Sequence, residues 1–362
     1  MKRNSPNLKK FFDFLIRQRI ALILIVIVLI ITVATSDFWT LRNQQNLGVA
    51  LAIDGIMVVG MTVVMVGAGL DLSVGSVMAL AGVLSVSLQE PLGLSVAIAA
   101  AISMGALAGI FNGLLVTKVG INPFIATLGT MIAVRGMAMT YTDGRPMANT
   151  NLAFVELGRG KIGIFPIPLL VFLVALIIGY LFLTHTQTGR EVYALGGNED
   201  AARASGIRTN RIKFISYLIS GLTAGISGVI LASRLSTGSP IIGEDTPLSV
   251  ITAVLLGGTS LTGGVGTIGG SLLGLLTVGS LSNGLSLLNV PAYYQRVAKG
   301  LLLIIVIIID SLYAQSRKRA LHRTRGLHGI KTEVISSNKY PPEFIDLSAA
   351  RGSHCVDFAS QS

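Results

Sequence analysis

Cysteine is almost absent from this chain of 362 residues, and charged residues are scarce. The single cysteine, Cys355, excludes a disulfide framework, a CxxC redox site and a cluster of thiolate metal ligands. Charged residues make up 12% of the sequence and hydrophobic residues 51%, whereas soluble domains carry about 25% charged residues. A soluble fold of this length could not bury so much apolar surface. The composition therefore predicts an all-α polytopic membrane protein.

Motifs for nucleotide binding and catalysis are also missing. No Gly-x4-Gly-Lys-Ser/Thr phosphate loop occurs, and the nearest match, Arg159-Gly160-Lys161, continues with isoleucine. His185 is the only histidine before residue 320, and no serine, histidine and acidic residue form a credible catalytic triad. We therefore expect no enzymatic activity, no metal and no cofactor in this chain. Energy for any active process must come from a partner or from an ion gradient.

Long apolar runs predict about ten membrane spans. They lie near residues 19–36, 47–67, 74–89, 93–116, 122–141, 164–184, 213–233, 246–258, 265–288 and 297–314. Some runs are too short for a full crossing, so broken or re-entrant helices are expected. The first run lacks a small-residue cleavage site, so it is interpreted as a retained anchor and not as a signal peptide.

The net charge of +11 is distributed as a membrane topology requires. With both termini in the cytoplasm, 20 of the 28 lysines and arginines fall in the predicted inner segments, which are 1–19, Lys118, 185–213 and 315–362. The charge therefore indicates orientation in a lipid bilayer and not nucleic-acid binding. We predict a basic cytoplasmic segment 1–19, a transmembrane domain 20–314, and a cytoplasmic tail 315–362 with little fixed structure.

A polar island interrupts the apolar sequence at Gly67-Ala-Gly-Leu-Asp71-Leu-Ser73-Val-Gly75-Ser76. Unpaired backbone and charge at membrane depth cost several kcal/mol each, so such a break survives only where protein buries it or where it lines a watery path. The island predicts a path for a polar solute. Asp71 could border that path, or it could cap the next helix, and both readings stay open.

A second break, Gly257-Gly-Thr-Ser-Leu-Thr-Gly-Gly-Val-Gly266, faintly echoes the first. Thr62-Val-Val-Met-Val-Gly67 precedes one break and Thr252-Ala-Val-Leu-Leu-Gly257 precedes the other. Paired interruptions in two parts of a transporter often mark the solute path. Glycines four residues apart predict close helix packing, at 105, 109 and 113, at 221 and 225, and at 266, 270 and 274. Asp54 and Arg135 are predicted to form a buried ion pair.

The predicted inner loop 185–213 contains a short helix. Asn198 is a suitable N-cap, Glu199 and Asp200 favour the first turn, and Gly206 ends the helix. Its small alanine side chains would let the groove of another protein close around it. Helix physics alone does not separate such a docking element from an ordinary connector.

Several segments, taken in order, resemble the ribose-type sugar permeases of ATP-binding cassette (ABC) importers over residues 20–314. They are Gly69 to Ser76, Phe111-Asn112-Gly113, Asn122-Pro123-Phe124 to Thr130, Gly189 to Ile207, Gly257 to Gly264 and Asn283-Gly284. The resemblance implies a permease in a bacterial cytoplasmic (inner) membrane that carries a monosaccharide. It also implies a second permease copy, a partner ABC ATPase subunit that binds ATP and Mg²⁺, and a periplasmic or surface sugar-binding protein.

The resemblance assigns candidate residues to two sites. The ATPase-coupling loop would use Arg190, Asn198, Glu199, Ala201, Ala202, Arg203 and Gly206. The translocation path would use Asp71, Ser73, Ser76, Asn112, Asn122, Phe124, Thr127 and Asn283, although the amides and the threonine could equally form hydrogen bonds between helices. Two other functions stay open, a nucleoside or branched-chain amino acid ABC permease and an ion-driven secondary transporter. The sequence does not specify the sugar.

Overall fold

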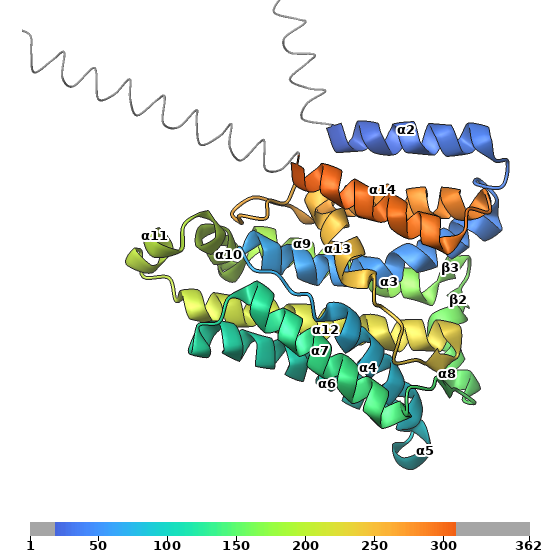
Figure 1. The fold of residues 1–362 in the computed structure, drawn as a ribbon, viewed down its shortest axis with the longest axis horizontal. Coiled ribbons are helices and arrows are strands. Elements are labelled where there is room, and N and C mark those ends of the chain that lie inside the picture. The colour runs from blue at the N-terminus through green and yellow to red at the C-terminus, as the bar shows by residue number, and fades with distance from the viewer. Residues whose placement is uncertain (1–18, 309–362) are drawn as a thin grey trace, which may run out of the picture. The chain divides into compact units, whose positions relative to one another are not determined.

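The computed structural model describes residues 19–308 (Figure 1). The predicted segment 1–19 and the predicted tail 315–362 lie outside these residues, apart from Arg19. The main helices of the described part are α2 (Arg19–Ala34), α3 (Leu41–Val66), α4 (Val74–Ser87), α6 (Leu94–Leu114), α7 (Pro123–Thr142), α9 (Ile167–His185), α12 (Thr209–Leu235), α13 (Thr246–Leu256) and α14 (Ile268–Leu287). Residues 292–308 are also helical.

Short elements connect these helices. They are α5 (Gln89–Leu92), the π-helical turn η1 (Leu115–Val119), α8 (Leu152–Arg159), α10 (Gln187–Gly197) and α11 (Glu199–Ala204). Strand β1 (Met147–Ala148) pairs antiparallel with β4 (Thr237–Gly238), and β2 (Lys161–Ile162) forms a hairpin with β3 (Phe165–Pro166). We call the extremity that carries α10 and α11 the α11 end, and the extremity that carries α8, β2 and β3 the α8 end (Figure 1).

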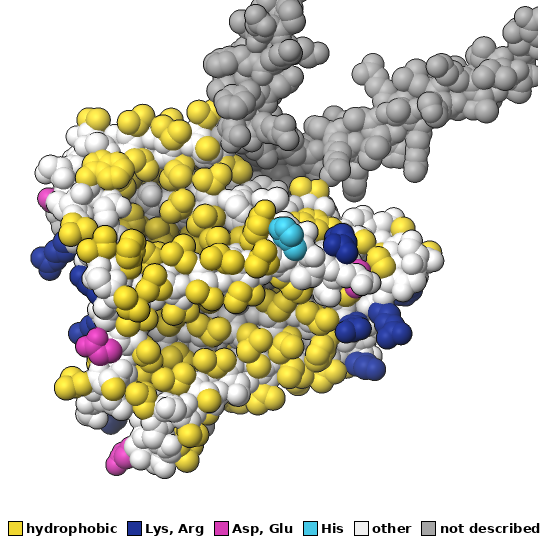
Figure 2. All heavy atoms as spheres, turned by 180° about the vertical axis from the view of Figure 1, so that it is seen from behind, with side chains coloured by type: hydrophobic (Ala, Val, Ile, Leu, Met, Phe, Trp, Pro, Cys, Tyr) yellow, Lys and Arg dark blue, Asp and Glu magenta, His cyan; other side chains and the backbone are white. Residues whose placement is uncertain are grey.

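The helical membrane fold expected from the composition is confirmed, since each predicted span coincides with a helix over the described residues. Six of these helices are long and apolar enough to cross a membrane. Hydrophobic side chains cover much of the surface between the two ends, while lysine and arginine side chains gather at the ends themselves (Figure 2). Apolar side chains such as Val33, Leu107 and Ile178 are exposed on this surface. The distribution suits a protein surrounded by lipid.

Helices α4 and α13 are apolar but too short to cross a bilayer alone. At 1.5 Å per residue, the 14 residues of α4 and the 11 residues of α13 span about 21 Å and about 16 Å, whereas the hydrocarbon core is about 30 Å thick. Their N-termini meet inside the molecule, where Gly75 lies against the carbonyl of Gly243 and the ring of Pro247. The structure therefore confirms that these two apolar helices are short, and their broken or re-entrant course in a membrane stays a prediction.

Helices α3 and α12 form the centre of the bundle. Ile56, Met57 and Met61 of α3 are fully buried, and Ser227 of α12 donates a hydrogen bond to the carbonyl of Ile53. The predicted glycine stripes of α6 and α12 do pack together, since glycines 105 and 109 of α6 lie against glycine 221 of α12. Small residues let these backbones approach closely. The resulting van der Waals contacts stabilise the packing, because the hydrophobic effect does not drive helices together in lipid.

One stripe prediction was partly wrong. Gly270 and Gly274 pack against Gly257 and Ala253 as a helix stripe should. Gly266, however, precedes the first residue of α14 and has a φ of 154°. Gly266 therefore belongs to the second break. Helix α14 begins after Thr267, whose side chain caps the helix by accepting a hydrogen bond from the amide of Gly270.

Candidate functional site

The polar island folds into a buried hydrogen-bonded cluster around Asp71, which is 1% exposed. One carboxylate oxygen accepts hydrogen bonds from the amide of Ser73 at 2.9 Å and from the hydroxyl of Ser73 at 2.6 Å. The other oxygen accepts from the hydroxyl of Ser220 in α12 at 2.7 Å. Asn112 of α6 donates to the Ser73 hydroxyl at 2.9 Å. The cluster thus joins the start of α4 to two neighbouring helices.

Asp71 lies next to the start of α4 but is not its N-cap residue. The N-cap residue of α4 is Ser73, and the bond from its amide to Asp71 forms a side-chain turn just before the helix. Ser76 adds a bond to the carbonyl of Ser73 at 2.9 Å. Sequence reasoning missed Ser220, because a serine within an apolar helix gives no local sign of a partner 149 residues away.

Of the remaining predicted path residues, Thr127 borders this cluster, whereas Asn122 and Phe124 are exposed. Asn122 is exposed and caps α7 by accepting a hydrogen bond from the amide of Phe124 at 2.9 Å. Phe124 itself is 50% exposed. Thr127 is buried. Its hydroxyl lies 2.9 Å from the carbonyl oxygen of Pro123 in its own helix and 3.4 Å from the carbonyl oxygen of Leu70 in the polar island. A role of these residues in a path stays a prediction.

The predicted Asp54–Arg135 ion pair was wrong. The guanidinium of Arg135 donates hydrogen bonds to the carbonyls of Pro240 and Ile242, in the chain that leads into α13. Asp54 lies in α3 and lines a different space, described below. Arg135 finds backbone partners because the connection before α13 leaves carbonyl groups without helical partners.

Separate roles for Asp54 and Arg135 predict additive effects. Arg135→Gln should lower the free energy of unfolding by about 1–3 kcal/mol, because two backbone carbonyls lose a charged donor. The double variant with Asp54→Asn should lose the sum of the two single effects, within about 0.5 kcal/mol. Chemical denaturation in detergent micelles measures all three variants. A coupling energy well above that margin would instead indicate that Asp54 and Arg135 interact directly.

The predicted helix of the inner loop is present as α11. Asn198 caps it by accepting a hydrogen bond from the amide of Ala201 at 2.9 Å. Gly206 ends it with a φ of 85°, where the amide of Ile207 bonds to the carbonyl of Ala202. Of the predicted coupling residues, Ala202 is buried and Glu199 is partly buried. The others are exposed, namely Arg190, Asn198, Ala201, Arg203 and Gly206. The exposed small-residue surface is available to another molecule.

Glu199 links α11 to the N-terminal part of α12. Its carboxylate pairs with Lys213 at 2.7 Å and with Arg203 at 3.0 Å. The hydrogen bond from Lys213 holds the pKa of Glu199 below its ordinary value, and the charges of Lys213 and Arg203 add to this effect. Glu199 therefore stays ionised at neutral pH. Its ion pair with Lys213 connects α11 to α12, and its ion pair with Arg203 lies within α11.

The two glycine-rich breaks meet each other and α10 at the α11 end. The amide of Gly264 donates to the carbonyl of Val66 at 2.8 Å. Gly196 of α10 packs on both of these groups so closely that a Cβ atom would overlap them. The hydroxyl of Tyr193 donates to the carbonyl of Gly266 at 2.8 Å. The paired breaks noted in the sequence are thus in direct contact, and the inner loop is packed on both.

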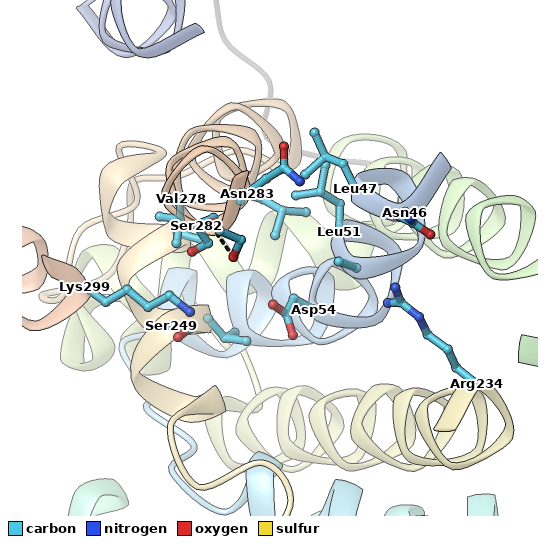
Figure 3. Close-up of a pocket in the computed structure, with 16 residues that line it drawn as sticks. Asn46, Leu47, Leu51, Asp54, Arg234, Ser249, Val278, Ser282, Asn283 and Lys299 are labelled. Carbon is cyan, nitrogen blue, oxygen red and sulfur yellow. Dashed lines mark hydrogen bonds between the residues drawn. The ribbon is translucent and has the colours of Figure 1, made fainter. Parts of the chain in front are cut away.

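A separate polar cavity of about 330 Å³ borders α3 around Asp54 (Figure 3). We call it the Asp54 cavity. Its walls come from α3, α12, α13, α14 and the helical residues 292–308, and its charged lining residues are Asp54, Arg234 and Lys299. Of the predicted path residues, Asn283 lines it, held by reciprocal amide bonds with Asn43 at 2.9 and 3.0 Å. Sequence reasoning missed Arg234 and Lys299 because they lie on helices distant in the chain.

A second cavity of about 340 Å³ lies near the α11 end. It is lined by the first break at Gly67 to Gly69, by Gly196 and Glu199 of the inner loop, and by Tyr217 of α12. Asp71 lines neither of the two cavities. The buried cluster around Asp71 therefore joins helices, while the open polar space of the molecule lies elsewhere.

An apolar surface between two polar ends, short apolar helices inside the bundle and polar cavities are features of a membrane transport protein. A family described as "Branched-chain amino acid transport system / permease component" matches residues 44–307. The chain belongs to this family of permease components.

Curated relatives extend the match over most of the chain. The ribose import permease protein RbsC of Escherichia coli (strain K12) is 40% identical over 322 residues, which cover 86% of this chain and 99% of the relative. RbsC of Bacillus subtilis (strain 168) is 42% identical over 293 residues, covering 79% and 90%. The L-arabinose transport system permease protein AraH of Escherichia coli (strain K12) is 38% identical over 288 residues, covering 79% and 87%. No solved structure matches the chain.

Proposed function

We propose that this chain is the membrane-spanning permease subunit of an ABC importer for a monosaccharide. The observation that carries the proposal is the match to permeases named for ribose import over 86% of this chain and nearly the whole relative. The exposed α11 segment, and the packing of the preceding helix α10 on both glycine-rich breaks, agree with a subunit driven by a partner. The chain would bind no ATP itself, since its sequence has no phosphate loop.

The assembly implied by this function has further members. A second copy of the permease would complete the membrane core, and an ABC ATPase subunit would bind ATP and Mg²⁺. A periplasmic or surface sugar-binding protein would deliver solute at the α8 end. The α11 end would then face the cytoplasm of a bacterium, in agreement with Arg190, Arg203, Arg208 and Arg211 near that end.

The alternatives are less well supported. The family description names branched-chain amino acids, but the named relatives quoted above are permeases for ribose and L-arabinose. An ion-driven transporter would need no exposed docking segment. Nucleoside import has no support from these relatives.

Reconstitution tests the proposed function. The chain is placed in proteoliposomes with its ATPase subunit and its binding protein, and uptake of labelled D-ribose, L-arabinose, a nucleoside and leucine is measured. Uptake of a sugar should require ATP and the ATPase subunit. Uptake by the chain alone, driven by a proton or sodium gradient, would refute the proposal.

Gly206 provides a test of the coupling role. At a φ of 85°, a side chain strains the backbone by about 1–2 kcal/mol, and Gly206→Leu also places a bulky group on the exposed α11 surface. We expect ATP hydrolysis to continue while sugar uptake falls at least about tenfold, as loss of about 1.4 kcal/mol of coupling would cause. Uptake and ATPase rates in the same proteoliposomes give the ratio.

Gly93 is a matched control for this variant. Its φ is 80°, its Cβ position is equally open, and it lies between α5 and α6, away from the α11 segment. Gly93→Leu should strain the backbone at least as much, because a ψ of 162° places Gly93 in a region that glycine alone adopts, and it should keep a normal ratio of uptake to hydrolysis. Equal ratios in the two variants would remove the coupling role of α11.

A further inference from the structure

The Asp54 cavity holds polar side chains that the protein itself leaves without partners. Asp54, Leu47 and Leu51 lie on one face of α3 and form one wall. No hydrogen bond or ion pair joins the Asp54 carboxylate to another group of the described residues. Lys299 and Arg234 point toward it from opposite sides (Figure 3). A carboxylate among apolar helices requires donors, and here the donors must come from what fills the cavity.

Hydroxyl groups complete the lining. The side chain of Ser249 on α13 and that of Ser282 on α14 border the same space, and neither has a hydrogen-bond partner in the described part of the chain. Asn283 is different, because Asn43 fixes its amide. The amide of Asn283 is therefore held by the protein, whereas within the described residues the side chains of Asp54, Ser249 and Ser282 are free to form hydrogen bonds.

The size and chemistry of the cavity limit what it can hold. A volume of about 330 Å³ is at the small end of the range of about 300–1,000 Å³ for small-molecule pockets. Carboxylate oxygens only accept hydrogen bonds, ammonium and guanidinium groups only donate, and hydroxyls do both. Leu51, Val250 and Val278 supply apolar surface between them. A ring that carries hydroxyls on its edge and C–H groups on its faces matches this pattern.

We propose that the Asp54 cavity is a binding site for the transported solute, one neutral polyhydroxylated ring such as a pentose. Asp54 accepts hydrogen bonds from ring hydroxyls, while Lys299 and Arg234 donate to hydroxyl oxygens on either side. Polar groups surround the cavity on several elements, which suits hydroxyls around a ring better than an amino acid whose polar groups lie at one end. The inference rests on the proposed function, because it names the place where that function holds its solute.

Thiol labelling tests occupancy without any transport assay. In the full chain with Cys355→Ser, the Ser282→Cys variant is treated with a charged thiol reagent. As D-ribose or L-arabinose is raised to saturation, labelling should slow at least about fivefold by mass action. Ser249→Cys repeats the measurement from the opposite wall. Ser36→Cys, on an exposed loop outside the cavity, should label equally fast with and without sugar.

The contrary outcomes are distinct. Protection by leucine in place of sugar, equal labelling with and without either sugar, or no labelling at either cavity position would each overturn the proposal.

An uptake measurement separates this proposal from the function on which it rests. In the assembled importer, Asp54→Asn should lower sugar uptake at least about tenfold, as expected for a lost charged hydrogen bond. The ATPase rate with the loaded binding protein should change less than about twofold. Asp37→Asn, at an exposed site, should match the unmodified chain in both assays. If the unmodified importer takes up no sugar, the proposed function fails. If it takes up sugar and Asp54→Asn is equally active, only the binding site fails.

Discussion

Gly196→Ala should destabilise this protein and abolish its transport activity. The added methyl group would overlap the carbonyl oxygen of Val66 and the amide nitrogen of Gly264. Both are backbone atoms, so no side-chain rotation relieves the overlap. Overpacking of this kind costs about 1–3 kcal/mol, and separating the Gly264–Val66 hydrogen bond costs about 1 kcal/mol more. We expect a loss of at least about 2 kcal/mol in the free energy of unfolding.

The neighbouring glycine gives the control. A Cβ atom on Gly197 meets nothing within 4 Å, and the residue is exposed at the end of α10. Gly197→Ala should therefore leave stability unchanged or raise it by about 0.5–1 kcal/mol, because alanine favours a helix over glycine. Denaturation of both variants in detergent micelles makes the comparison. Equal stability of the two would show that the two breaks and α10 are not packed as described.

The transport effect of Gly196→Ala has a separate reason. Gly196 is where the inner loop contacts both breaks, so displacing it would weaken the contact between the inner loop and the breaks, and α11 would be held mainly by its ion pair with Lys213. Variants that still fold should hydrolyse ATP in the assembled importer without moving sugar. Normal uptake by folded Gly196→Ala protein would show that force reaches the membrane helices by another route.

Asp71→Asn should be the most damaging isosteric change in the polar island. The carboxylate accepts hydrogen bonds from the amide and hydroxyl of Ser73 and from the hydroxyl of Ser220. An asparagine has one oxygen and an NH2 group, so the Ser220 hydroxyl would have to accept from the NH2 group, in conflict with its present role as a donor. At 1% exposure, no bulk water compensates for the conflict. We expect a loss of about 3 kcal/mol in the free energy of unfolding, in the range for breaking hydrogen bonds to a buried charge.

A second substitution distinguishes this cause from a general loss of charge. Ser220→Ala removes one of the facing donors, so its cost should shrink by about 1 kcal/mol or more in the Asp71→Asn background. Asp143→Asn is the control, because Asp143 is exposed at the end of α7 with a φ of 49°, which asparagine tolerates equally. It should change stability by less than about 0.5 kcal/mol. Strict additivity of Asp71→Asn and Ser220→Ala would contradict the shared cluster.

Features that depend on neighbours in the chain could be predicted from the order of the amino acids. An apolar run of sufficient length forms a helix because the backbone must satisfy its own hydrogen bonds in lipid. The start and end of α11 follow from Asn198 and Gly206, since the bonds at these caps reach only three to five residues along the chain. The glycine spacing of α6 and α12 likewise predicted a face for close packing on each helix, but not which helix packs against it.

The partner of each buried polar group was set by how the helices pack. Asp71 bonds to Ser220, Arg135 bonds to carbonyls before α13, and Asp54 faces Arg234 and Lys299 across a cavity. Opposite charges within the spans suggested a pair of Asp54 and Arg135, but charge does not encode distance. A buried polar side chain takes whichever donor or acceptor the packing brings within about 3 Å. Packing is a property of the whole bundle, so the lining of the Asp54 cavity, which comes from helices far apart in the chain, could be identified only in the assembled fold.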